Sequence, residues 1–169
     1  MGYPIGYPAA SELNRLTTQS KVNSMVDFNE LLNADIDSFE KPAPLPVGSY
    51  EAFVKSTKFD KSQQKQTDYV RLTLGVTAAG PDVDPDQLAE FQSISNLADV
   101  ELTYDYYITE KSLYRLKDDA RNVFGIQGQA TLAQIIEQLP SKEVTVQIAH
   151  TASKDGKTQY ANVKSLLAK

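Results

Sequence analysis

The sequence contains no cysteine and no tryptophan, and its single histidine is His150. Without cysteine the chain has no disulfide framework, no thiolate metal site and no cysteine nucleophile. One histidine also removes the multi-histidine metal sites and most Ser-His-Asp schemes. These absences exclude the commonest catalytic and metal-binding arrangements.

Long apolar runs and targeting signals are missing as well. No stretch approaches the roughly 18 residues that a membrane span needs. The segment Met1–Pro8 has neither a basic region nor an apolar core, so we expect no secretory signal. Gly6 stands where a myristoylation motif needs Ser or Thr. We therefore expect a cytoplasmic protein with no membrane partner.

The chain does have enough apolar residues for one domain of ordinary size. Of its 169 residues, 41% are hydrophobic and 23% are charged, which is typical of a folded protein. The formal net charge is -5. An acidic average argues against a nucleic-acid partner, because phosphate affinity comes from lysine and arginine.

Composition divides the chain into residues 1–47 and residues 48–169. The first part opens with two Gly-Tyr-Pro repeats and closes with three prolines at alternate positions, which predicts an extended, partly disordered N-terminal arm. Within it, residues 26–32 can form one short helix that Asp27 caps. Residues 48–169 are predicted to form the folded domain.

Alternating apolar and polar residues predict strands in this domain, since a half-buried strand has a period of two. Residues 80–98 contain Gly80-Pro81 and Asp84-Pro85 and are predicted to form a long loop. Asp155-Gly156 predicts the turn of a final hairpin. The alternating apolar sets that predict the strands are Tyr50, Ala52 and Val54; Val70, Leu72, Leu74 and Val76; Val100, Leu102, Tyr104 and Tyr106; and Val144, Val146 and Ile148.

Two helices are predicted between the third and fourth strands. Thr109 caps the first, which Gly125 ends, and Thr131 with Gln134 forms a capping box for the second. The fold class is therefore mainly β with a helical insertion. Five short strands with helices after the third are typical of a five-stranded OB-fold-like Greek-key barrel.

Candidates for catalysis are weak. Asp82–Asp86 imitates the start of a calcium loop, but Gln87 and Ser93 stand where that loop needs Gly and Glu. Asp155-Gly156-Lys157 has the spacing of some metal-dependent nucleases, yet the tight turn explains it. No carboxylate is evident to orient His150. We expect no enzyme activity, no metal and no cofactor.

Charge is distributed unevenly along the chain. Residues 53–71 and 140–169 each carry a net charge of +3, whereas residues 82–110 contain eight acidic residues and no basic one. The positive charge therefore gathers on the first and last hairpins. In an OB-fold, the turns of these two hairpins flank the groove that binds single strands.

Aromatic side chains accompany the basic residues, as base stacking requires. If Tyr50, Ala52 and Val54 point inward, Phe53 and Lys55 point outward. The same argument places Tyr69 and Arg71 outward, and leaves the faces of Tyr104, Tyr106 and Tyr107 open, since a one-residue slip reverses them. The alternative is that these charged and aromatic residues belong to an ordinary solvent-exposed surface that binds no nucleic acid. The predicted nucleic-acid-binding residues are Phe53, Lys55, Lys58, Phe59, Lys61, Lys65, Tyr69, Arg71, Lys154, Lys157 and Tyr160.

The segment Phe39–Ala52, with Leu45-Pro46-Val47-Gly48-Ser49-Tyr50, resembles the start of a phage family of OB-fold single-stranded DNA-binding proteins. The helix Lys111–Phe124 and the strand opened by Ser141–Val144 are similar to that family as well, so the resemblance covers about residues 26–169. It implies a protein that coats single-stranded DNA with little sequence preference during phage DNA replication or recombination, in the host cytoplasm. The chain departs from many such proteins because it ends Leu166–Lys169 and not in an acidic tail.

Two other functions stay open. The chain can be a protein-interaction OB module, a virion or replisome adaptor that acts through residues 82–98 and the arm. In that case the acidic segments contact replication or recombination proteins. A metal-dependent nuclease that uses Asp155 is the third hypothesis. The sequence leaves the oligomeric state open, a homo-oligomer included.

Overall fold

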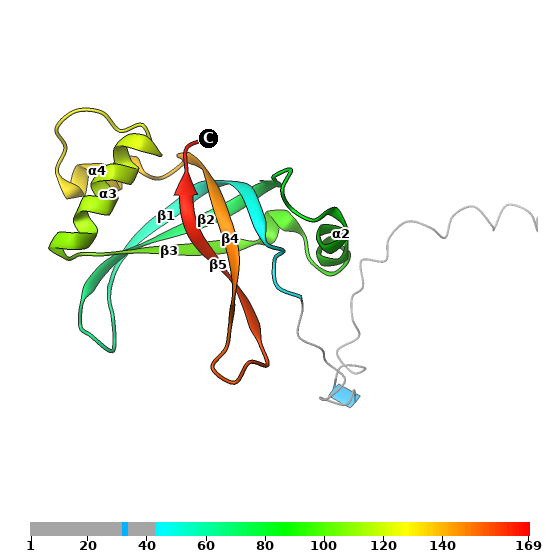
Figure 1. Ribbon diagram of the computed structural model, residues 1–169. Coiled ribbons are helices and arrows are strands. Elements are labelled where there is room, and N and C mark those ends of the chain that lie inside the picture. The colour runs from blue at the N-terminus through cyan, green and yellow to red at the C-terminus, as the bar shows by residue number, and fades with distance from the viewer. Residues whose placement is uncertain (1–31, 34–42) are drawn as a thin grey trace, which may run out of the picture. The chain divides into compact units, whose positions relative to one another are not determined.

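The computed structural model of the chain describes residues 32–33 and 43–169 (Figure 1). The chain divides into two units, Met1–Lys41 and Pro42–Lys169. Of the first unit only Leu32 and Asn33 are described, and both are helical. Residues 1–31 and 34–42 of the predicted arm, with most of its expected helix at 26–32, lie outside the described residues. Across the described residues, no helix is both long and apolar enough to span a membrane.

Pro42–Lys169 is built on one sheet of five antiparallel strands. The sheet order is β3-β2-β1-β4-β5, so β1 is central and β3 and β5 are its edges. Every neighbouring pair is antiparallel. The mainly β class and the five strands predicted from sequence are confirmed. The strands are β1 (Gly48–Lys61), β2 (Asp68–Ala79), β3 (Glu101–Tyr107), β4 (Glu143–Ala152) and β5 (Gln159–Leu167).

Helices α3 (Glu110–Asn122) and α4 (Leu132–Gln138) follow β3 in the chain, where two helices were expected. The Thr109 side chain accepts a hydrogen bond from the backbone N–H of Ser112, which starts α3. Thr131 and Gln134 form the expected capping box of α4. Local side-chain chemistry therefore fixes where both helices begin.

The long loop expected at residues 80–98 is wrong. The structure has helix α2 (Pro85–Ile94) there, followed by a short 3-10 helix, η2 (Leu97–Asp99). The Asp84 side chain accepts from the backbone N–H groups of Asp86 and Gln87, at 2.9 and 3.1 Å. Pro85 occupies the first helical turn, where a missing N–H costs nothing. An Asp-Pro pair interpreted as a helix breaker is therefore a helix start.

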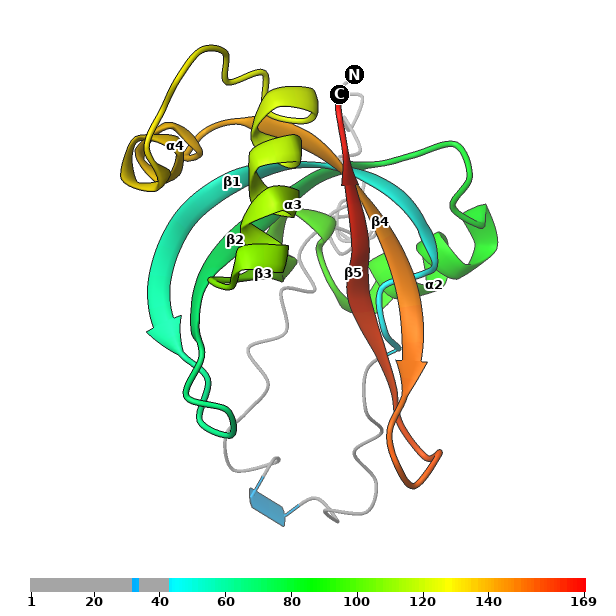
Figure 2. The ribbon, with the colours of Figure 1, turned by 60° about the vertical axis from the view of Figure 1, so that its left-hand side comes forward.

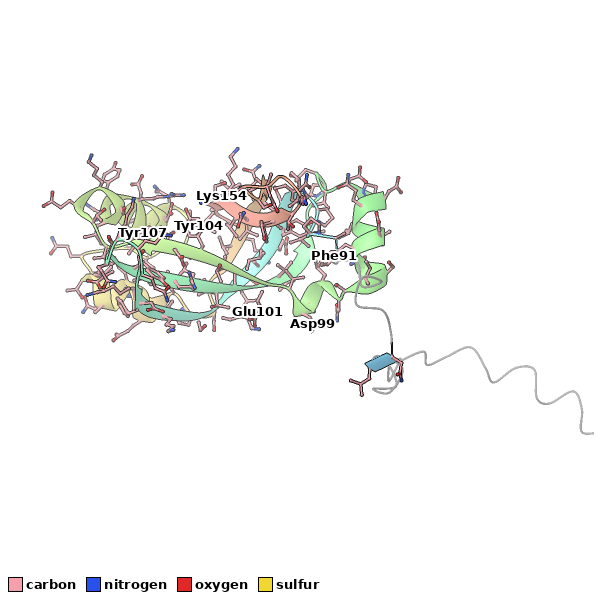
Figure 3. All side chains as sticks on the ribbon, turned by 90° about the horizontal axis from the view of Figure 1, so that it is seen from below. Phe91, Asp99, Glu101, Tyr104, Tyr107 and Lys154 are labelled. Carbon is pink, nitrogen blue, oxygen red and sulfur yellow. The ribbon has the colours of Figure 1, made fainter. Side chains whose placement is uncertain are left out.

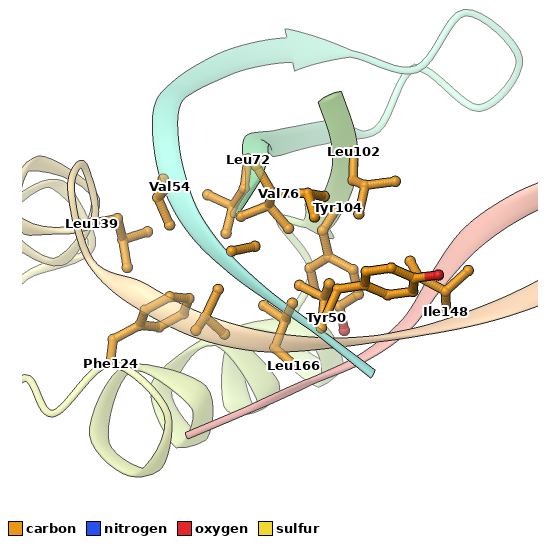
Figure 4. Packing of buried hydrophobic residues seen from close by; sticks show 14 of the residues in the cluster. Tyr50, Val54, Leu72, Val76, Leu102, Tyr104, Phe124, Leu139, Ile148 and Leu166 are labelled. Atoms are coloured by element: carbon orange, nitrogen blue, oxygen red, sulfur yellow. The ribbon is translucent and has the colours of Figure 1, made fainter. Parts of the chain in front are cut away.

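The apolar residues of all five strands meet in one core (Figure 4). Tyr50 and Val54 of β1 and Leu72 of β2 are fully buried, as the alternation predicted. Phe124, after α3, and Leu139, after α4, close the core from the helical side. Two register shifts between β1 and β2, at Glu51/Ala52 and Val54/Ser56, accompany the strong curvature of β1 in Figure 2.

Helix α3 is tied to β3 through a buried hydroxyl. The Tyr106 hydroxyl donates to the Asp119 carboxylate at 2.7 Å. Burial, followed by this hydrogen bond and the Asp119 charge, raises the pKa of Tyr106. The tyrosine is thus neutral at ordinary pH and serves as a donor in the core.

The segment before β1 packs on the sheet. Leu45 is buried in the core, although composition assigned residues 43–47 to the arm. The Tyr50 hydroxyl donates to the Pro46 carbonyl at 2.9 Å, and His150 Nε2 donates to the Leu45 carbonyl at 2.8 Å. Burial, and then the nearby Asp82 charge, raise the pKa of Tyr50 to about 12. His150 therefore has a structural role, which is to hold this segment against β4.

Asp82 joins the beginning of β1 to the turn after β2. Its carboxylate accepts from the Ser49 backbone N–H at 3.1 Å and from the Ser49 hydroxyl at 2.9 Å. These bonds, the backbone one first, lower the pKa of Asp82 below its ordinary value of 3.8. The bonds exist while the carboxyl is ionised, so their stabilising effect is present above pH 3.8. It is lost as the pH falls from there through the lowered pKa.

We expect Asp82→Asn to lower the free energy of unfolding at pH 7 and to have progressively less effect as the pH falls below 3.8. Urea unfolding of both proteins at a series of pH values measures this difference. Asp118→Asn, an equal charge change on the exposed side of α3, is the control and should show no such trend. A difference between wild type and Asp82→Asn that stays constant down to the lowest pH contradicts the assignment.

Candidate nucleic-acid interface

Two hairpin turns project from the same side of the sheet (Figures 1 and 2). The β1–β2 turn comprises residues 62–67 and is closed by a hydrogen bond from Ser62 N–H to the Thr67 carbonyl at 2.9 Å. The β4–β5 turn comprises residues 153–158 and is closed from Ser153 N–H to the Thr158 carbonyl at 2.7 Å. Gly156 has a φ of 70°, which the turn requires and glycine adopts at no steric cost.

Three lysines on these turns have no carboxylate partner in the part of the chain that the structure describes. Within residues 43–169, Lys65, Lys154 and Lys157 form no ion pair. By contrast, the Lys58 ammonium lies 3.1 Å from Asp60 and that of Lys61 lies 3.5 Å from Asp68. The turn lysines without carboxylate partners are therefore the strongest candidates for contacts with an external anion.

An exposed aromatic side chain lies next to each turn. Phe59, near the end of β1, is 59% exposed, and Tyr160, near the start of β5, is 49% exposed. Aromatic side chains with this much exposed surface contribute little hydrophobic stabilisation to their own fold. Both predicted stacking residues are thus accessible from solvent beside a basic turn.

The outer face of β2 and β3, opposite the core, carries a pair of tyrosines. Tyr69 and Tyr107 are register partners, and their ring centroids are 5.7 Å apart. Tyr69 is only 9% exposed, and the Arg71 guanidinium lies 5.1 Å above its ring. Tyr69 is therefore on the predicted face, but little of its ring is left for a base. Tyr107 is 45% exposed and is the accessible member of the pair.

Sequence reasoning left Tyr107 unassigned, and the structure places it on this outer face. Figure 3 views the molecule from the side toward which both turns project and labels Tyr107 and Lys154. The signal for Tyr107 was present in the period of two, because Leu102, Tyr104 and Tyr106 are buried and the next residue must face outward. Only the sheet register shows that it pairs with Tyr69.

Arg71 does not present an uncompensated charge. Its Nε and Nη2 atoms each donate to the Asp105 carboxylate at 2.8 Å, which is a bidentate pair. The hydrogen bond to Asp105 is the main reason that the pKa of Arg71 is raised further above its ordinary value. With Lys61, Tyr69 and Tyr107 this pair lines a polar depression of about 260 Å³.

Phe53 and Lys55 share the outer face, as predicted. A Cβ on Gly75 of β2 would lie 3.0 Å from both side chains, so these two residues cover the glycine closely. Phe53 is half-buried there, and Lys55 forms an ion pair with Glu101 of β3. The predicted residues thus separate into accessible groups at the turns and paired or partly covered groups on the strands.

The acidic residues whose spacing resembles a calcium loop or a nuclease site form hydrogen bonds within the fold. Asp82 binds Ser49 and Asp84 caps α2. Asp155 accepts hydrogen bonds from the Ser153 hydroxyl and from the Lys157 backbone N–H, and these lower its pKa. Among the described residues, no group of three or more His, Asp or Glu side chains could hold a metal ion.

Comparison with known proteins places the chain in a family. A family model described as a protein of unknown function, DUF669, matches residues 30–168. The chain belongs to this family. The match covers residues 42–168 of the β-rich unit and the twelve residues before it, so all five strands and both turns lie within the matched segment. No curated protein matches the chain.

Proposed function

We propose that this protein is a non-catalytic OB-fold protein that coats single-stranded DNA with little sequence preference, in phage DNA replication or recombination. The observation that carries the proposal is the pair of basic turns on one side of the sheet, each with an exposed aromatic beside it. Cations track the phosphates of a strand and aromatic rings stack on its bases, whatever their sequence.

The sheet order supports the OB-fold part of the proposal. In β3-β2-β1-β4-β5, the first strand lies between the second and the fourth, and the edges β3 and β5 are those that a small Greek-key barrel brings together. OB-folds bind single strands across strands 2 and 3 and the turns between strands 1 and 2 and between 4 and 5. The depression beside Tyr107 and the lysines of both turns occupy these places.

The ion pairs at the β1–β2 hairpin do not oppose this function. Lys58, Lys61 and their carboxylate partners are largely exposed, and exposed ion pairs contribute only about 0–1 kcal/mol. A phosphate can replace such a carboxylate at small cost. Arg71 differs, because its bidentate pair with Asp105 fixes its geometry, so we assign it to supporting Tyr69 and not to phosphate binding.

Fluorescence anisotropy with labelled oligo-dT, oligo-rU and duplex DNA at two salt concentrations tests the proposal. We expect oligo-dT to bind best, with an affinity that falls steeply as salt rises, because each neutralised phosphate releases a counterion. In the same assay Tyr107→Ala should weaken oligo-dT binding by about 5- to 150-fold, the range for loss of one stacked base.

Tyr114→Ala is the matched control, since Tyr114 is an exposed tyrosine on α3 that does not line the depression beside Tyr107. It should leave the affinity unchanged. Equal, weak binding to all three ligands would overturn the proposed function. Equal losses for Tyr107→Ala and Tyr114→Ala would remove Tyr107 from the interface.

The alternative of a protein-interaction module rests on residues 82–98, which the structure shows as α2 and its flanks and not as a loop. Binding of no oligonucleotide, together with a partner that is lost when this segment is changed, would favour that alternative. The nuclease hypothesis receives no support from Asp155, which is occupied in its own turn.

A further inference from the structure

Helix α2 and the pair α3 and α4 lie at opposite ends of the β-rich unit. Figures 1 and 3 show this arrangement, with the sheet between the two ends. The two ends differ in charge. Helix α2 carries Asp86 and Glu90 and no basic residue, whereas α3 carries Lys117 and Arg121 on one face, four residues apart.

The end formed by α3 and α4 has a depression of about 190 Å³. Ala120, Ile126 and Ile135 form an apolar floor, and Lys117 and Arg121 stand among its lining residues. Both basic side chains are exposed, and neither forms an ion pair within residues 43–169. A cavity of about 150 Å³ holds a benzene molecule, so this one has room for a branched aliphatic side chain.

Helix α2 presents groups complementary to this depression. Asp86, Glu90 and Ile94 follow one another at intervals of four and lie along one side of the helix. Leu88 and Phe91 pack toward the core on an adjoining side of the helix, and Ile94 is 63% exposed. An exposed isoleucine beside two carboxylates matches an apolar floor with two cations at its rim.

We propose that α2 of one copy docks into the α3–α4 depression of a second copy, with Ile94 on the apolar floor and Asp86 and Glu90 toward Lys117 and Arg121. One chain cannot make this contact with itself, because the two surfaces are at opposite ends. The contact is head to tail, so it continues from copy to copy and forms either open chains or closed rings. It requires no DNA, and on the proposed function it would align successive copies along a strand.

Sedimentation velocity of the full chain without DNA tests this contact. We expect the average mass to rise with protein concentration up to about 0.5 mM and to fall when salt screens the charges. Lys117→Glu/Arg121→Glu and Asp86→Lys/Glu90→Lys should each weaken association at least about 10-fold. Lys154→Glu/Lys157→Glu makes the same charge change as the first variant at the β4–β5 turn and should associate like wild type.

Mixing the two charge-reversed variants keeps the test decisive, because each variant supplies the surface that the other now needs. The mixture should recover association, while circular dichroism verifies that each variant is folded. A wild type that stays monomeric at every concentration, variants that associate normally, or folded variants that fail to recover on mixing would each overturn the contact. Binding of a short oligo-dT by Lys117→Glu/Arg121→Glu should be unchanged, which separates this result from the proposed function.

Discussion

Reversal of the charges of Lys154 and Lys157 is expected to lower the affinity for oligo-dT by about 100-fold at low salt, if each lysine contributes about one tenfold step. Both lysines lie on the β4–β5 turn and form no ion pair within residues 43–169. Their full positive charge is therefore available to a phosphate in the wild-type protein. Anisotropy titrations of Lys154→Glu/Lys157→Glu at several salt concentrations measure the effect. The dependence of log K on log salt should be shallower by about 1.4, the value for two phosphates on a single strand.

Lys111→Glu/Lys164→Glu carries the same change in net charge outside both turns and is the matched control. It should cost far less affinity and leave the salt dependence nearly unchanged. Lys58→Glu/Lys61→Glu should fall between the two, because Asp60 and Asp68 already neutralise these lysines in part. Equal losses in all three variants would mean that binding follows net charge and not the turns.

Leu72→Ala should lower the free energy of unfolding by about 3–4 kcal/mol, within the range for a buried leucine that leaves a cavity. Leu72 is fully buried in β2, between its register partners Thr57 of β1 and Tyr104 of β3 (Figure 4). Its side chain contributes to the one core that all five strands share. Urea unfolding at pH 7 gives the difference directly, provided that the slope with denaturant stays the same.

Thr73→Ala provides the control at the next residue of the same strand. Thr73 is only half-buried and faces the outer side of the sheet, opposite the core. Its loss should change the free energy of unfolding by less than about 1 kcal/mol. Similar losses from both substitutions would contradict the assignment of the two faces of β2.

Most of the β-rich unit follows from local patterns in the sequence. The buried alternation of Tyr50, Ala52 and Val54 identifies β1 and its inner face, and the threonine caps identify α3 and α4. Helix α2 was missed because Pro85 was interpreted as a breaker, although proline suits a first helical turn when Asp84 precedes it.

The candidate site was predictable only in part. The accessible groups beside the turns, such as Lys154 and Phe59, were found because charge and turn chemistry are local properties. Tyr69 was assigned to the right face, but Arg71 covers it, and that arginine is held by Asp105, 34 residues away. No local pattern shows a contact over such a separation. The register of β2 and β3 was therefore needed to replace Tyr69 by Tyr107 as the candidate stacking residue.

The sequence by itself determined the strands, the caps and the concentration of positive charge in two hairpins, because each depends on residues close together in the chain. The tertiary structure alone decided that the two basic turns project to one side and that Leu45 belongs to the core. The tertiary structure also decided which lysines form ion pairs with a carboxylate. It placed α2 and the α3–α4 depression at opposite ends of the β-rich unit. Each of these depends on strand order and on packing between distant segments, which period and composition do not encode.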